Sequence, residues 1–151
     1  MIMIKNTQRT ISINTKKLQN TIHNILKFLN YNDFDIGIWI TTNKTIQKYN
    51  KKYRNKDKPT DILSFPFHQI IPGTRIKPKT DEEKQLGDII ISAEFAKNKA
   101  RVENIPFEKY LIILVIHGIC HLLGYTHNTD AAYKKMHQKE LQILAHLRLK
   151  T

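Results

Sequence analysis

Three histidines stand close together in the segment HGICHLLGYTH at 117–127. His117 and His121 are four residues apart, so on a helix their side chains leave the same face, one turn apart. Gly124 follows them, and glycine readily takes the left-handed conformation that ends a helix. A chain that reverses there can bring His127 back to the pair. The spacing therefore predicts one zinc ion held by three imidazoles, a ligand type that binds zinc at about 2.0 to 2.1 Å.

Other interpretations of this segment remain open. A histidine on an apolar helix is often a core residue, and Cys120 could be either a fourth ligand or a small buried hydrophobe, which is its ordinary role. The HxxxHxxGxxH spacing, shared with the metzincin zinc enzymes, favours the metal site. Those proteases carry a glutamate general base beside the first histidine, where this chain has Gly118. Four further histidines are predicted not to bind the metal: His23, His68, His137 and His146.

Three neutral imidazoles would leave a zinc ion its full double charge and an open position. Such a centre attracts anions, lowers the pKa of a bound water and polarises a phosphoryl oxygen. The chain is also basic, with 25 Lys plus Arg against 13 Asp plus Glu and a net charge of +12. Seven basic residues and one acid fall between Lys44 and Lys58. The cluster is either a solvated helix face or a contact for a polyanion, and the second favours phosphodiester chemistry on a nucleic acid.

The hydrophobic pattern alternates between strand and helix periods. RTISI at 9–13 predicts a first strand, and the pattern after Thr15 predicts a helix that ends near Asn30. Further strands are predicted at 33–41, 61–67 and 87–92, and a basic helix follows the first of these. The chain is predicted to be helical from Ser92 onward, with a break at 104–106 and an apolar helix at 107–123. The order β-α-β-α-β-β-α-α-α predicts an α+β fold with one small mixed sheet of about four strands, about five helices and the zinc site at the end of a buried helix.

Length and composition predict one domain over residues 1–151. A single cysteine rules out an internal disulfide, and neither a signal peptide nor an apolar run of transmembrane length is apparent. We therefore expect a cytoplasmic protein that makes no contact with a membrane.

Four segments resemble one known family, the YbeY-type endoribonucleases, which are metal-dependent factors of ribosomal RNA maturation. They are YRNKDKPTDILSFPF (53–67), LGDIIIS (86–92), HGICHLLGYTH (117–127) and MHQKE (136–140). The resemblance implies that His117, His121 and His127 bind zinc and that Arg54 and His117 are catalytic. It implies single-stranded precursor of the small-subunit (16S) ribosomal RNA as substrate, with no DNA. A ribosomal protein or a ribosome-associated GTPase is a further candidate partner.

Arginine suits the implied role, because its planar guanidinium offers two donors to a phosphate whose charge rises in the transition state. We expect Arg54, Lys56 and Lys58 to bind the substrate. The chain departs from the family where an aspartate usually precedes the third histidine, since Thr126 stands there and Asp130 is only a possible substitute. Loss of such an orienting group can weaken metal binding by about 10- to 100-fold.

Asp61 and Asp88 either line the cleft or serve turn and strand-edge roles, and Arg75 and Lys77 on the long connection either contact RNA or are only solvated. Two alternatives to an endoribonuclease remain at this stage. One is a non-catalytic ribosome-assembly factor in which zinc only stabilises the fold and the basic face binds ribosomal RNA or a ribosomal protein. The other is a divergent metalloprotease, which needs a carboxylate base from elsewhere in the chain.

Overall fold

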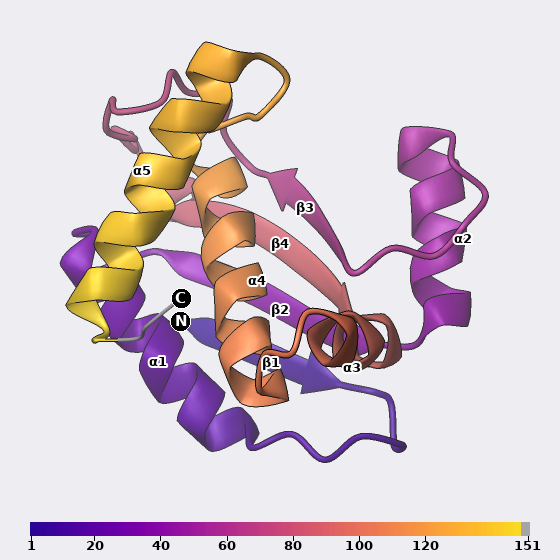
Figure 1. The fold of residues 1–151 in the computed structure, drawn as a ribbon. Helices are drawn as coiled ribbons and strands as arrows, with labels where there is room; N and C mark the ends of the chain where they lie inside the picture. Colours follow the sequence, from indigo (N-terminus) through magenta and orange to yellow (C-terminus); the bar gives the residue numbers. More distant parts are fainter. Residues whose placement is uncertain (149–151) are drawn as a thin grey trace.

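A four-stranded sheet carries five α-helices in the computed structural model, which describes residues 1–148 (Figure 1). The strands are β1 (Ile2–Asn6), β2 (Asp35–Thr41), β3 (Ile62–Pro66) and β4 (Gln85–Ser92). The helices are α1 (Thr15–Phe28), α2 (Asn43–Arg54), α3 (Ala93–Val102), α4 (Phe107–Leu122) and α5 (Asp130–His146), with a 3-10 turn η1 (Asp81–Glu83). The predicted α+β class and the predicted order of elements are confirmed.

The sheet has the order β1-β2-β4-β3. β1, β2 and β4 run parallel, whereas β3 pairs antiparallel with β4 and forms an edge. Side chains alternate between the two faces along each strand. The strand predicted at 33–41 is confirmed as β2, and its Ile36, Ile38 and Ile40 are all buried against the helices of one face.

The two faces of the sheet are covered unequally. α1, α4 and α5 enclose the main core on one face, and α4 is its central helix. α2 packs against the other face through Ile46, which meets Leu63 and Ile90 in a small second cluster. Figure 1 shows α2 standing apart from α4 and α5, beyond β3. The second face is therefore covered at one end only.

The first strand was misplaced by the sequence pattern. RTISI at 9–13 is not a strand; β1 lies earlier, at Ile2–Asn6, and pairs with β2. The segment that follows β1 is turned by the side chain of Gln8. Its Oε1 accepts from the backbone N–H groups of Thr10 and Ile11, and its amide donates to the Ile11 carbonyl. A side chain that bonds the local backbone in this way competes with strand pairing.

Side-chain hydrogen bonds cap the N-termini of α1, α2, α3 and α5. The cap of α1 is Asn14, whose side chain accepts from the Lys17 N–H. In residues 1–148 no single helix is long and apolar enough to cross a membrane, although the bent pair α3 and α4, 114° apart, reaches that length and composition together.

Candidate metal centre

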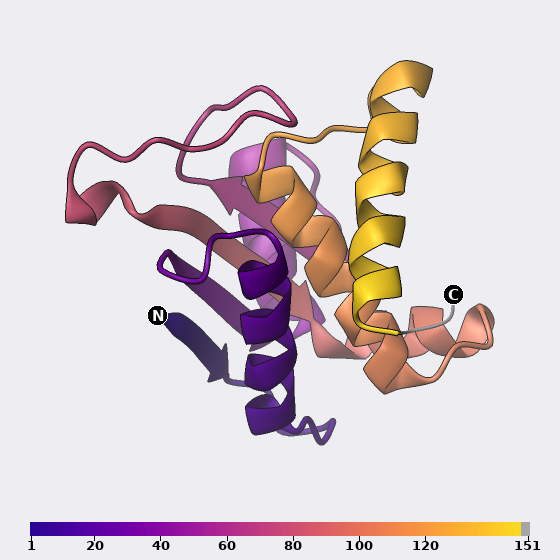
Figure 2. The same ribbon diagram turned by 90° about the vertical axis from the view of Figure 1, so that its left-hand side faces the viewer.

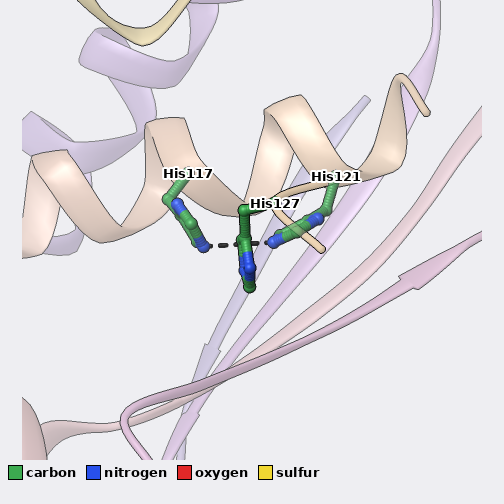
Figure 3. A group of neighbouring side chains, drawn as sticks. All are labelled: His117, His121 and His127. Carbon is green, nitrogen blue, oxygen red and sulfur yellow. Dashed lines mark hydrogen bonds between the residues drawn. The ribbon is translucent and has the colours of Figure 1, made fainter. Parts of the chain in front are cut away.

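The three histidines of the opening motif converge at the C-terminal end of α4. Figure 3 shows His117 and His121 leaving the same side of the helix and His127 meeting them from the segment that follows. One nitrogen from each ring lies within 4.8 Å of the others, so the group could hold a metal ion. His117 and His121 are partly buried, whereas His127 is exposed. The predicted geometry is therefore present.

Gly124 makes this convergence possible. Its φ of +94° is in the left-handed region that disfavours any residue with a side chain. Tyr125 then donates its N–H to the Cys120 carbonyl, which closes the turn. A Cβ at Gly124 would also collide with the backbone carbonyl of Ile70, in the long connection between β3 and β4. That connection loops out beside the end of α4 (Figure 2). Glycine is thus required both by the turn and by its neighbour.

Hydrogen bonds at Nδ1 orient two of the rings. Nδ1 of His117 lies 2.9 Å from Oε2 of Glu140, and Nδ1 of His121 lies 2.9 Å from the Tyr125 carbonyl. An ionised carboxylate and a carbonyl can only accept, so both Nδ1 atoms carry the proton. A ring in this tautomer presents the lone pair of Nε2. This is the arrangement in which histidine binds a metal through one nitrogen and an orienting acceptor through the other.

The two Nε2 atoms face each other at 3.1 Å. Two lone pairs at this separation repel unless a cation lies between them, and the third imidazole beside them favours a metal ion over a shared proton. Neighbouring ligands of a tetrahedral zinc ion, each about 2.0 to 2.1 Å from it, lie roughly 3.3 Å apart. The separation of this pair therefore suits a shared tetrahedral metal ion, and the nitrogens of all three rings lie within 4.8 Å of one another.

Burial also keeps His121 neutral. Loss of solvent, together with the neighbouring His117 and His127, lowers the pKa of His121 from 6.5 to about 4, although its bond to the Tyr125 carbonyl and the charge of Glu140 act in the opposite direction. A neutral imidazole is the form that binds a metal ion.

Glu140 is a functional residue that the sequence analysis missed. It lies on α5 with only 17% of its side chain exposed, and it is the carboxylate that contacts the centre. The two positions considered for this role do not fill it. The hydroxyl of Thr126 donates to Asn128, and Asp130 is exposed in the first turn of α5. A signal was available, because Glu140 falls between Met136 and Ile143 on the buried stripe of α5.

Gly118 faces away from the histidines. A Cβ at this position would lie 2.7 Å from Cδ1 of Ile89 and 3.0 Å from Cδ1 of Ile62, on the sheet beneath α4. The protease glutamate has no room here. Cys120 is also part of the core, and burial raises the pKa of its thiol from 9.0 to about 12. This favours its interpretation as a buried hydrophobe.

Arg54 and the three histidines line one cleft of about 900 Å³. Arg54 ends α2 and reaches the outer edge of β3, where its Nη2 donates to the Ser64 carbonyl at 2.8 Å. Its guanidinium also lies over the Phe65 ring, 5.6 Å from the centroid. Two contacts therefore hold a cation in the cleft that the histidines also line, although α2 and α4 cover different faces of the sheet.

Other candidates are divided between the cleft and its surroundings. Asp61 lines the cleft, and so does His68, whose Nε2 lies 2.7 Å from the Glu83 carbonyl. Asp88 lies on the opposite face of the sheet. Lys56 and Lys58 are not among the residues that line the cleft; both are exposed on the turn after α2. Arg75 and Lys77 are exposed and lie outside it.

Comparisons with known proteins show the family of this chain. The family model described as "Endoribonuclease YbeY" matches residues 3–148. The chain belongs to the YbeY endoribonuclease family. A human YbeY endoribonuclease is 38% identical over 151 residues, which cover 99% of this chain and 90% of the human protein. One from Acetivibrio thermocellus is 38% identical over 98% of this chain and 97% of its own length.

Family membership extends to the fold. The solution structure of TM1509 from Thermotoga maritima matches with a TM-score of 0.60 and 25% identity, over 98% of this chain and 92% of the other. The resemblance noted in the sequence is therefore confirmed across nearly the whole length of the YbeY relatives. None of these comparisons identifies the metal.

Proposed function

We propose that this chain is a zinc-dependent endoribonuclease that cuts single-stranded RNA, with small-subunit (16S) ribosomal RNA precursor as its substrate. Its zinc ligands are His117, His121 and His127. The observation that carries the proposal is the single cleft that these rings share with Arg54. A basic side chain in the same cleft as a metal-binding triad suits a phosphodiester, because the guanidinium and a bound metal ion would attract the same anion.

Arg54 acts as a catalytic residue in this proposal. Its bond to Ser64 and its contact with Phe65 hold the guanidinium in place before substrate arrives. A preorganised donor stabilises the charge that develops on the phosphate without further reorganisation. A bound zinc ion would supply positive charge at the facing wall.

His117 and Glu140 act together. The carboxylate accepts the Nδ1 proton and so keeps Nε2 of His117 directed into the cleft. Lys56 and Lys58 bind substrate phosphates outside the cleft. Buried Asn50 fixes their turn, because its carbonyl accepts from the Lys56 N–H and its amide donates to the Lys58 carbonyl.

We also propose that the chain forms a single domain and acts in the cytoplasm, where ribosomal RNA precursors are processed. A ribosomal protein or a ribosome-associated GTPase is a proposed additional partner. Neither partner is needed for the proposed chemistry of the cleft.

Metal analysis combined with RNA cleavage tests the proposal. We expect about one zinc per chain, cleavage of an unstructured RNA, loss of cleavage with a chelator and recovery when zinc is restored. The same sequence annealed into a duplex should be cut far more slowly. Full activity in metal-free protein would refute the role of the centre.

The second candidate function, that of a non-catalytic assembly factor, is distinguished from the endoribonuclease by the Arg54→Ala variant. The endoribonuclease proposal expects RNA binding to persist while cleavage is lost. If wild-type protein and Arg54→Ala bind RNA equally and neither cuts it, the endoribonuclease proposal is replaced by an RNA-binding role in which the metal is structural. Casein degradation that is sensitive to chelator would instead support the metalloprotease, which the position of Gly118 disfavours.

A further inference from the structure

The uncovered face of the sheet carries a groove separate from the metal centre. Its volume is about 490 Å³, and it lies where α2 leaves the sheet exposed. Met3, Gly37 and Asp88 are opposite one another on β1, β2 and β4 and form its floor. Gly37 leaves room in this floor for the Asp88 carboxylate, with which a Cβ at position 37 would collide.

Four aromatic rings border this groove in a continuous row, which we call the aromatic row: Trp39, Tyr49, Tyr53 and Phe65. Successive centroids are 5.5, 6.1 and 5.3 Å apart. Tyr53 is 51% exposed, and the other three are partly buried against the small apolar cluster of α2. The rings are thus anchored by packing but remain accessible.

Cations accompany the aromatic row at both ends. Nζ of Lys5 lies 5.5 Å from the Trp39 ring and Nζ of Lys52 lies 5.2 Å from the Tyr53 ring. The guanidinium of Arg54, a residue that also lines the catalytic cleft, lies over the Phe65 ring. Asp88 is the one acid among the described residues that line the groove. The aromatic row therefore leads directly from the groove to the proposed catalytic arginine.

We propose that the aromatic row is a second RNA subsite, on which unpaired bases of the strand held in the cleft stack. Aromatic rings bind bases through their faces, while neighbouring cations bind the phosphates, and this combination is typical of single-strand binding surfaces. Asp88 can accept a hydrogen bond from a base amino group. The proposal rests on the proposed function, since the strand it holds is the one that is cut.

Trp39 is the only tryptophan in the chain, so its fluorescence reports on the groove. Its indole N–H donates to Oγ1 of Thr7 at 2.9 Å, which fixes the ring. Titration of the full chain in chelator with an unstructured 12-nucleotide RNA should quench this fluorescence and saturate. Heparin, which has charge but no bases, should bind without comparable quenching.

Substitutions of single tyrosines test whether the aromatic row is the surface that binds the RNA. Tyr53→Leu should weaken binding of the 12-mer by about 5- to 150-fold, the range for one lost base stack, whereas Tyr53→Phe should retain it. Tyr133→Leu is the matched control, because Tyr133 is 54% exposed on α5, outside the groove. A trinucleotide long enough only for the cleft should be insensitive to Tyr53→Leu.

Two results would overturn the second subsite. One is RNA binding, measured by polarisation of labelled 12-mer, with no change in Trp39 fluorescence. The other is equal quenching by heparin and RNA, which would indicate a general polyanion surface. These outcomes are distinct from failure of the endoribonuclease proposal. His117→Ala should abolish cleavage and keep the quenching of Trp39. If wild-type protein shows the quenching but cuts no RNA, the aromatic row binds RNA and the endoribonuclease proposal fails.

Discussion

Nδ1 of His117 and Oε2 of Glu140 lie 2.9 Å apart and join α4 to α5 at the metal centre. The contact does more than connect two helices. It fixes the tautomer of one ligand, and its negative charge makes the imidazole a stronger electron donor. Because Glu140 is largely buried, the surrounding solvent screens this interaction only weakly.

Glu140→Gln should reduce zinc affinity by about 10- to 100-fold, the usual effect of losing a partner of this kind. The amide oxygen can still accept the Nδ1 proton, so the loss comes mainly from the charge. Competition with a chromophoric chelator measures the affinity. Glu108→Gln is the control, since that carboxylate is exposed and contacts only Lys17 among the described residues. An unchanged affinity in Glu140→Gln would remove the carboxylate from the centre.

His117→Ala should lower the zinc content of purified protein well below one ion per chain and abolish RNA cleavage. Removing one of three ligands leaves two, too few for the usual zinc site. Elemental analysis and a cleavage assay provide the measurements. The control is His23→Ala, an exposed histidine of α1, which should retain both properties. Circular dichroism separates loss of metal from loss of fold. A folded His117→Ala with full zinc would contradict the ligand assignment.

The meeting of the three histidines could be predicted because its geometry is local. A helix of known pitch and a glycine at its end determine where three side chains meet, and neither depends on the rest of the chain. Arg54 is different. It comes from the other side of the sheet and reaches the cleft only around the free edge of β3, so its place depends on strand order. The sequence connected it to the histidines only through family resemblance.

Two errors have physical causes. RTISI has the alternation of a strand, but the side chain of Gln8 bonds the backbone there, and periodicity carries no information about such competition. Glu140 was missed because a carboxylate in a helix of mixed polarity looks like a surface residue. Its burial follows from the packing of α5 on α4, and the sequence indicated it only through the short stripe of Met136 and Ile143 on either side of Glu140.

Gly118→Glu should destabilise the fold and create no protease. The new side chain would point at Ile89 and Ile62, and burial of an unpaired carboxylate costs about 3–5 kcal/mol. Gly118→Ala is the matched control. Its crowding involves only the flexible ends of two isoleucines, and the gain in helix propensity of about 1 kcal/mol offsets it. Urea unfolding followed by circular dichroism compares the two. A Gly118→Glu variant as stable as wild type that degrades casein would show that this helix face reaches the metal.

Arg54→Lys should reduce kcat for RNA cleavage by about 100- to 1,000-fold, the cost of losing one positioned donor to the transition state. Lysine keeps the charge, so the affinity for RNA should fall much less than the rate. The guanidinium donates to the Ser64 carbonyl and lies over the Phe65 ring, and an ammonium group lacks the planar set of donors that makes both contacts possible. Single-turnover cleavage at saturating enzyme separates the rate of the chemical step from binding. Arg101→Lys, an exposed change in the last turn of α3, should match wild type. If Arg54→Lys lost binding in proportion to rate, Arg54 would be a phosphate anchor in the ground state instead of a transition-state donor.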